Sequence, residues 1–303
     1  MLNNVLLPGF LFICISLPVM AESSCGEQGV QLQVLGSGGP ELGDNRASSS
    51  YVIWHDGKAR LLVDMGSGSL FHFEQSGASL NDLDLVLLTH MHVDHSSDLP
   101  ALIKASFFTD RKRDLPLYGP TGNDLMPALT VFVQRLFGSD GAYRYLNSYL
   151  DGTDSYRLIP HDVMATGTAE QLVREDDVYR ITAVPVHHGP VPALAWRVQV
   201  AGKTIVFSGD MNNDNDTLTG LAQQADILVA HHAIPEGTTG VARDLHMPPS
   251  VIGRIAAQAQ VKQLILSHRM LRTLGKEEDS LRYIKEHYSG PVRFADDMNC
   301  FSL

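Results

Sequence analysis

Four side chains of the types that bind metal ions stand directly after an apolar run, and this cluster constrains the fold more than any other feature. Leu85–Leu88 is continuously apolar and predicts a buried strand. The chain continues as Thr89-His90-Met91-His92-Val93-Asp94-His95. His90 and His92 share one face of an extended chain and can bind one ion, whereas Asp94 and His95 can reach a second ion about 3.5–4 Å away. Because burying such groups without a compensating cation is costly, the cluster predicts a two-metal site.

Short apolar runs alternate with helical stretches along the rest of the chain. The predicted strands, besides the run before the cluster, are Val30–Leu35, Tyr51–Trp54, Arg60–Asp64, Val178–Val186, Leu194–Val200, Thr204–Ser208, Ile227–Ala230 and Gln263–Ser267. The predicted helices are Leu99–Phe107, Asn123–Phe137, Leu218–Gln224, Ser250–Gln260 and Glu277–His287. Strands in groups with helices outside them predict an α/β fold of stacked sheets. Residues 138–177 are predicted to form either a long insertion near a site or a surface loop without a role.

The pattern His-x-His-x-Asp-His after a hydrophobic strand resembles the signature of the metallo-β-lactamase fold. The resemblance implies a four-layer αββα sandwich and further ligands at the ends of later strands, which are present in order as His188, Asp210 and His268. It assigns His90, His92 and His188 to one ion, Asp94, His95 and His268 to the other, and Asp210 to both. Alternation along the preceding strand favours His188 over its neighbour His187.

Other segments are similar to the ribonuclease Z and arylsulfatase-like branch of this superfamily. They are the Gly-rich segment Leu35–Pro40 and the strand end Leu62–Gly68, in which Asp64 is expected to orient a ligand histidine. His246 stands where the branch carries a loop histidine that protonates the leaving group, although histidine is also common on surfaces. His232 replaces the glutamate that ribonuclease Z carries beside this loop.

The resemblance implies a metal-dependent hydrolase with two Zn²⁺ ions, or Mn²⁺ or Fe in their place. Asp94 and His246 are the candidate catalytic residues: the first orients a hydroxide that bridges the ions, and the second donates a proton. Trp196 and Phe108 are candidates for packing an aromatic leaving group or for plain core burial.

Charge and composition bear on the substrate. The net charge of −11 repels phosphate backbones, and no Gly- and Lys-rich arm for clamping tRNA is evident. We therefore expect a small anionic ester, either a sulfate ester or a phosphodiester, with nucleic acid unlikely as a partner. The alternatives are a ribonuclease Z-like phosphodiesterase acting on RNA, a lactone or β-lactam hydrolase, and a non-catalytic metal-binding protein. A homodimer is compatible with the sequence.

The first residues predict export. Val5–Val19 is largely apolar but is interrupted by two prolines, so it is too short for a comfortable membrane span. Val19-Met20-Ala21 resembles a signal-peptidase site. We expect residues 1–21 to be a signal peptide and residues 22–303 to be the hydrolase domain, periplasmic or secreted, with no stable membrane anchor after cleavage; an uncleaved anchor is the alternative. Cys25 and Cys300 can pair in an oxidising compartment.

Overall fold

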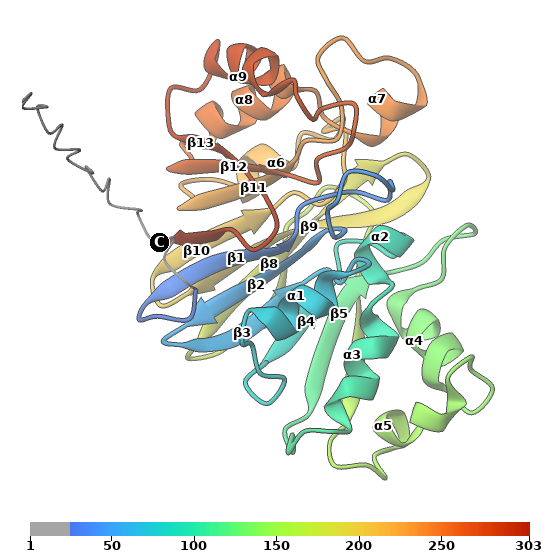
Figure 1. Ribbon diagram of the computed structural model, residues 1–303. Helices are drawn as coiled ribbons and strands as arrows, with labels where there is room; N and C mark the ends of the chain where they lie inside the picture. The colour runs from blue at the N-terminus through green and yellow to red at the C-terminus, as the bar shows by residue number, and fades with distance from the viewer. Residues whose placement is uncertain (1–24) are drawn as a thin grey trace, which may run out of the picture.

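Two seven-stranded sheets form the centre of the molecule (Figure 1). The computed structural model describes residues 25–303. The first sheet consists of β14 (Cys300–Ser302), β1 (Val30–Gly36), β2 (Ser50–His55), β3 (Lys58–Val63), β4 (Leu85–Leu87), β5 (Leu115–Pro120) and β6 (Leu158–Val163), in that order. The second consists of β13 (Val292–Phe294), β12 (Gln263–Ser267), β11 (Ile227–His231), β10 (Lys203–Phe207), β9 (Val191–Val200), β8 (Tyr179–His188) and β7 (Gln171–Glu175).

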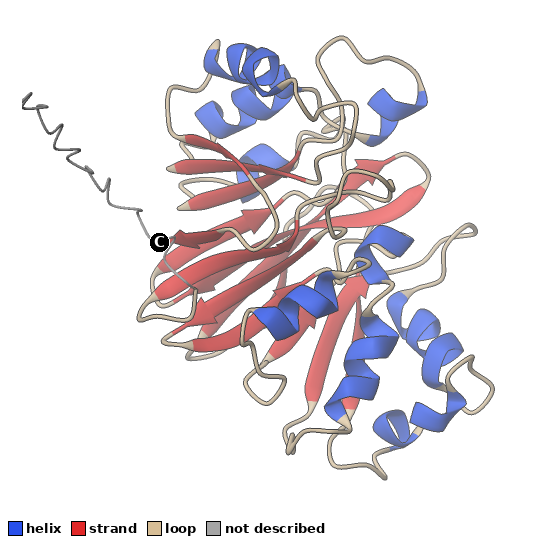
Figure 2. Ribbon diagram, in the orientation of Figure 1, coloured by secondary structure: helices blue, strands red, loops and turns tan. Residues whose placement is uncertain are grey.

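Helices cover the outer face of each sheet (Figure 2). The first sheet is covered by α1 (Ser69–Gln75), α3 (Leu99–Ser106) and α4 (Leu129–Phe137), and the second by α6 (Leu218–Leu221), α8 (Pro249–Gln258) and α9 (Glu277–Lys285). The shorter elements are α2 (Val93–Ser96), the 3-10 turn η1 (Arg144–Leu146), α5 (Ser148–Asp151) and α7 (Val241–Leu245).

Alternating side chains along each strand explain the layers. In β2, Ile53 packs between the two sheets while Val52 packs under the helices. In β12, Ile265 belongs to the same central layer while Leu264 faces the helices of the second sheet. Both sheets are therefore buried on two faces, and the four-layer αββα fold expected from the sequence is confirmed.

The parallel strands of each sheet direct their carboxyl ends toward the candidate site. Strands β3 to β6 run parallel to one another, and so do β10 to β13. The candidate ligands stand at or just beyond the ends of β4, β8, β10 and β12. Each half of the chain thus contributes side chains to one place.

Several departures from the sequence prediction concern edge strands. Residues 138–177 contain β6 and β7 with two short helical turns, instead of one long loop. The strand sequences LIPHDV and QLVRE are polar or contain proline, as is common at sheet edges.

The helix predicted from Asn123 begins only at Leu129, because the Asn123 carboxamide accepts hydrogen bonds from two following backbone amides and forms a turn.

The ends of the described chain are covalently joined. Cys25 and Cys300 form a disulfide with their Cα atoms 5.6 Å apart, and β14 pairs antiparallel with β1. The predicted signal peptide, residues 1–21, lies outside the described residues. Among residues 25–303, none of the helices has the length and apolar character that a membrane crossing requires.

Candidate metal centre

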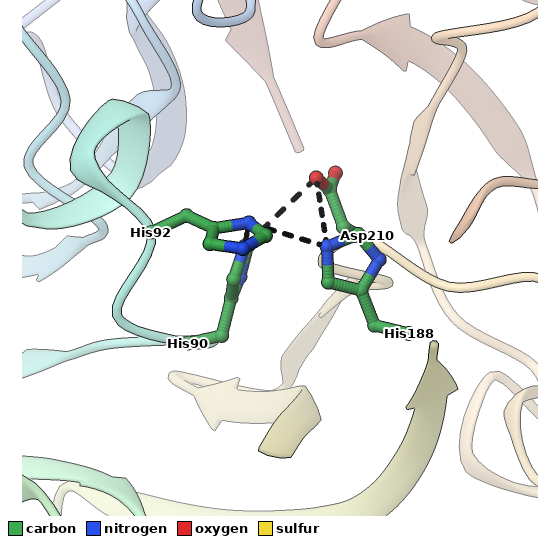
Figure 3. Close-up of side chains that lie close together, drawn as sticks. All are labelled: His90, His92, His188 and Asp210. Atoms are coloured by element: carbon green, nitrogen blue, oxygen red, sulfur yellow. Dashed lines mark hydrogen bonds and ion pairs between the residues drawn. The ribbon is translucent and has the colours of Figure 1, made fainter. Parts of the chain in front are cut away.

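A first cluster is formed by His90, His92, His188 and Asp210 (Figure 3). Its three imidazole rings direct nitrogen atoms at a common point, and Asp210 lies beside them. Nε2 of His90 lies 3.1 Å from Nδ1 of His92, and Nε2 of His188 lies 3.3 Å from the same atom. Ligand nitrogens around a tetrahedral Zn²⁺, with bonds of about 2.0–2.1 Å, stand about 3.3 Å apart. The spacing of these nitrogens therefore fits one metal ion.

A second cluster adjoins the first and shares Asp210 with it. Oδ2 of Asp94 lies 3.5 Å from Nε2 of His95 and 3.2 Å from Nε2 of His268. Oδ2 of Asp210 lies 3.6 Å and 3.3 Å from the same two nitrogens. This oxygen also lies 3.7 Å from Nε2 of His188 in the first cluster. One carboxylate oxygen thus faces both groups of possible ligands.

Hydrogen bonds behind the rings set which nitrogen faces the site. Nδ1 of His95 donates to Oδ2 of Asp64 at 2.8 Å, and Nδ1 of His188 donates to the carbonyl oxygen of Leu245 at 2.9 Å. Such a bond leaves the other ring nitrogen without a hydrogen and able to bind a metal. Nε2 of His95 is buried and has no hydrogen-bond partner within the described part of the chain. The ligand histidine that Asp64 is expected to orient is therefore His95.

The carboxylates of the site require positive charge nearby. Burial opposes a charge on His95, but Asp94 and Asp64 outweigh it and raise the pKa of this histidine. Burial likewise opposes a charge on His268, while Asp210 and Asp94 raise its pKa to about 9. Divalent cations can supply the same charge in place of these protons and keep the histidines neutral. The residues present therefore fit a metal pair.

His246 follows α7 and lies against both clusters. Its ring centroid is 5.5 Å from that of His188 and 5.7 Å from that of His268. Its Nδ1 lies 3.9 Å from Oδ1 of Asp210 and makes no hydrogen bond to a described residue. Burial lowers the pKa of His246 to about 3, against the opposing effect of Asp210. Since an anion beside a histidine raises its pKa, we expect His246 to gain its proton when an anionic substrate is present.

The structure brings together the eight side chains that the sequence proposed for the site: His90, His92, Asp94, His95, His188, Asp210, His246 and His268. Their individual roles stay predictions. His187 lies outside both clusters, where its Nδ1 accepts a hydrogen bond of 2.7 Å from the Asn212 amide. His232 also points elsewhere, because its Nε2 is bonded to Ser280 Oγ on α9 at 2.9 Å.

Neither aromatic candidate is among the residues of the two clusters. Trp196 is fully buried between the sheets, where its indole N–H donates to the carbonyl oxygen of Leu88. Phe108 follows the end of α3 and is 77% exposed. Core burial therefore explains Trp196.

His231 is a residue for which the sequence suggested no role. It ends β11 and belongs to the group formed with His95, Asp210 and His268. Its Nδ1 lies 2.7 Å from Oδ1 of Asp210. The sequence did contain a signal for this residue: His231 stands directly after the apolar run Ile227–Ala230, just as the other candidate ligands stand after apolar runs.

Comparison with known families identifies the class of protein. The family described as "Beta-lactamase superfamily domain" matches residues 59–269, so the chain belongs to this superfamily, and its site is that of a metal-dependent hydrolase. The chain is 28% identical over 283 residues to "Ribonuclease Z" of Mycobacterium bovis (strain BCG / Pasteur 1173P2), with 89% of this chain and 97% of that protein covered. It is 29% identical over 283 residues to "Ribonuclease Z" of Mycobacterium sp. (strain KMS), with 89% and 95% covered.

Solved structures share the fold. The metallo-beta-lactamase fold protein YhfI from Bacillus subtilis matches with a TM-score of 0.69 and 24% identity, over 90% of this chain and 98% of that chain. The short form of human tRNase Z matches with a TM-score of 0.70 and 21% identity, over 90% and 98% of the two chains. These structures show the shared fold, and the family match over residues 59–269 confirms the superfamily predicted from the sequence.

The relatives correct the prediction about the substrate. The chain matches proteins named Ribonuclease Z over 89% of its length, so the expectation that nucleic acid is an unlikely partner, and a small anionic ester the favoured one, is wrong. The net charge of −11 describes the whole surface. Phosphate binding depends on the field at the site, where bound divalent cations are the largest local charges.

Proposed function

We propose that this protein is a phosphodiesterase that cleaves RNA with two divalent metal ions, with Zn²⁺ the expected species. The observation that carries the proposal is the pair of His/Asp clusters joined by Asp210, in a chain whose relatives bear the name Ribonuclease Z. When bound, the ions would supply Lewis acidity and a water molecule of lowered pKa. The comparisons give no support to the sulfate esters that the sequence also suggested.

The residues divide into holders of the ions and groups that move protons. His90, His92 and His188 would hold the first ion, and Asp94, His95 and His268 the second, with Asp210 between them. The buried Asp94 carboxylate of the second cluster would orient the attacking water. His246, whose Nδ1 lies 3.9 Å from Oδ1 of Asp210, would protonate the departing ribose oxygen.

A substrate panel on metal-analysed protein tests this function. It compares an RNA hairpin with an unpaired 3′ extension, the DNA of the same sequence, bis(p-nitrophenyl) phosphate, p-nitrophenyl sulfate, a lactone and a chromogenic β-lactam. We expect cleavage of the RNA and of the activated phosphodiester, and loss of both activities in Asp210→Asn. Faster turnover of the sulfate, the lactone or the β-lactam than of either phosphodiester would refute the proposal.

We further propose that the enzyme acts in the periplasm or outside the cell. The Cys25–Cys300 disulfide supports this location, because structural disulfides persist in oxidising compartments. Cell fractionation and amino-terminal sequencing test it: we expect a processed chain beginning at Glu22 outside the cytoplasm. An intact chain in the cytoplasm with reduced cysteines would contradict it.

A further inference from the structure

A series of buried hydrogen bonds ends on Oδ1 of Asp210. Nδ1 of His231 lies 2.7 Å from this oxygen, and Nε2 of the same ring lies 3.1 Å from the Tyr51 hydroxyl. The hydroxyl is also bonded to Ser267 Oγ at 2.8 Å. All four residues are 2% exposed or less. The protein, rather than solvent, therefore holds this oxygen in place.

The two oxygens of Asp210 have different surroundings. Oδ2 lies 3.3–3.9 Å from Nε2 of four histidines, namely His90, His95, His188 and His268. Oδ1 makes its hydrogen bond to His231 on the other side. The oxygen that faces the ligand groups is thus distinct from the oxygen that the protein holds.

The hydrogen positions follow from the chemistry of the groups. An ionised carboxylate only accepts hydrogen bonds, so Nδ1 of His231 carries the hydrogen and donates it to Asp210. In a neutral ring Nε2 then accepts the single hydrogen of the Tyr51 hydroxyl. The Ser267 hydroxyl has a hydrogen of its own, so it is the donor in the contact between Ser267 and Tyr51. Tyr51 therefore selects the form of His231 that can bind Asp210.

We propose that His231, held by Tyr51, is a positioning residue: by binding Oδ1 it fixes the Asp210 carboxylate so that Oδ2 stays turned toward both groups of side chains that would hold the ions. The inference rests on the proposed function for the presence of two ions. Without the hydrogen bond the carboxylate would be free to rotate, and Oδ2 would no longer be held toward both groups, so the affinity for one of the two ions should fall.

His232 is a matched control within the same segment. It is the next residue in the chain, is fully buried, and has its ring directed at Ser280 and Phe294 rather than at Asp210. Substitution of His232 removes a buried imidazole of the same size without removing a contact to Asp210. It therefore separates a packing effect from an effect on Asp210.

The experiment measures Zn²⁺ binding to the metal-depleted protein in competition with a chromophoric chelator, with the circular dichroism of each variant as a check on folding. We expect His231→Ala to weaken one of the two binding events by about 10–100-fold, as loss of a partner behind a ligand does. His231→Asn should restore most of the affinity, because its amide N–H can take the place of Nδ1–H. Tyr51→Phe should give a smaller loss, and His232→Ala none.

The outcomes are distinguishable. Equal changes in His231→Ala and His232→Ala, or unchanged binding in both His231→Ala and Tyr51→Phe, would overturn the inference. If His231→Ala does not fold, Tyr51→Phe decides alone, since it removes only a hydroxyl: weaker binding supports the inference and unchanged binding overturns it. The absence of two binding events in the unaltered protein would instead refute the two-metal function, and the inference with it.

Discussion

Single residues at this site adopt backbone conformations that cost stability. Asp64 follows β3 with φ at 55°, and His268 follows β12 with φ at 54°. A non-glycine residue in this left-handed region costs roughly 1–2 kcal/mol. Both turns aim a side chain at the site: Asp64 reaches His95, and His268 reaches Asp94. Strain of this kind is characteristic of functional sites.

We expect Asp64→Asn to lower the affinity for the second ion by about 10–100-fold. The Asp64 carboxylate accepts hydrogen bonds from Nδ1 of His95 and from both the backbone amide and the hydroxyl of Thr89. An amide has only one oxygen, so it cannot accept all three. Metal content after dialysis measures the effect, with the exposed Asp177→Asn as control. Full metal content in Asp64→Asn would contradict the assignment.

His246→Ala should leave the metal content unchanged and slow the chemical step by about 10²–10⁴-fold. The histidine lies 3.9 Å from Asp210 Oδ1 but is not among the nitrogens that gather in either cluster. The loss should be smaller for a nitrophenolate leaving group, which departs without protonation. His92→Ala, by contrast, should lose metal and activity for every leaving group. Rates over a series of leaving groups test both variants, and an equal slowing of all esters by His246→Ala would exclude the acid role.

The loops that follow the strands pack so closely that some positions accept only glycine. A Cβ on Gly66, just after β3, would lie 2.2 Å from the carbonyl oxygen of Asp94 and 2.5 Å from Cβ of Ser48. A Cβ on Gly39 would lie 2.8 Å from Cε1 of His268. The glycines near the sequence motifs therefore let the loop backbones approach the candidate ligands.

Gly66→Ala should lower the free energy of unfolding by about 1–3 kcal/mol, the usual cost of inserting a methyl group into a packed region. The matched control is Gly220→Ala in α6, where a Cβ would meet nothing within 4 Å. Alanine there should be neutral or slightly stabilising, since it favours helix. Urea unfolding of the two variants gives the comparison. A Gly66→Ala protein as stable as Gly220→Ala would show that the loop rearranges freely.

The sequence predicted the continuous apolar strands far better than those interrupted by proline or glycine. The run before His90 and the run before His268 are continuous and apolar, so each reads as a buried strand, and the site lies where they end. The strand β5 (LPLYGP) contains two prolines and a glycine, so it lacks the local pattern of a strand. Pairing with its neighbours forms it nonetheless, and such tertiary contacts are not visible in a local window.

At the scale of the whole molecule, the site depends on both halves of the chain. The first sheet supplies His90, and the second supplies His188 and Asp210. The resemblance to a known family, carried by the order of the motifs, implied that these side chains meet at one site. The spacing of the motifs along the chain does not by itself determine which strands come together. Overall charge misled the substrate prediction for a related reason: it averages over a surface of which the site is a small part.

The last strand of the chain returns to the first sheet. After β13, Asp297 accepts hydrogen bonds from the backbone amides of Ser37 and Ala47, and β14 then pairs with β1. The Gly-rich loop that contacts His268 is thus held by the C-terminal segment. The Cys25–Cys300 disulfide fastens this segment to the start of the described chain.

Loss of this disulfide should therefore destabilise the whole fold, and we expect Cys25→Ser with Cys300→Ser to lower the free energy of unfolding by about 2–5 kcal/mol. The cross-link joins residues 275 positions apart, so it removes much of the freedom of the unfolded chain. Thermal unfolding with and without reductant measures the effect, and the double variant should be insensitive to reductant. Counting thiols in unreduced, denatured protein that begins at Glu22 checks the bond itself: we expect none, and two free thiols would show that the disulfide does not form.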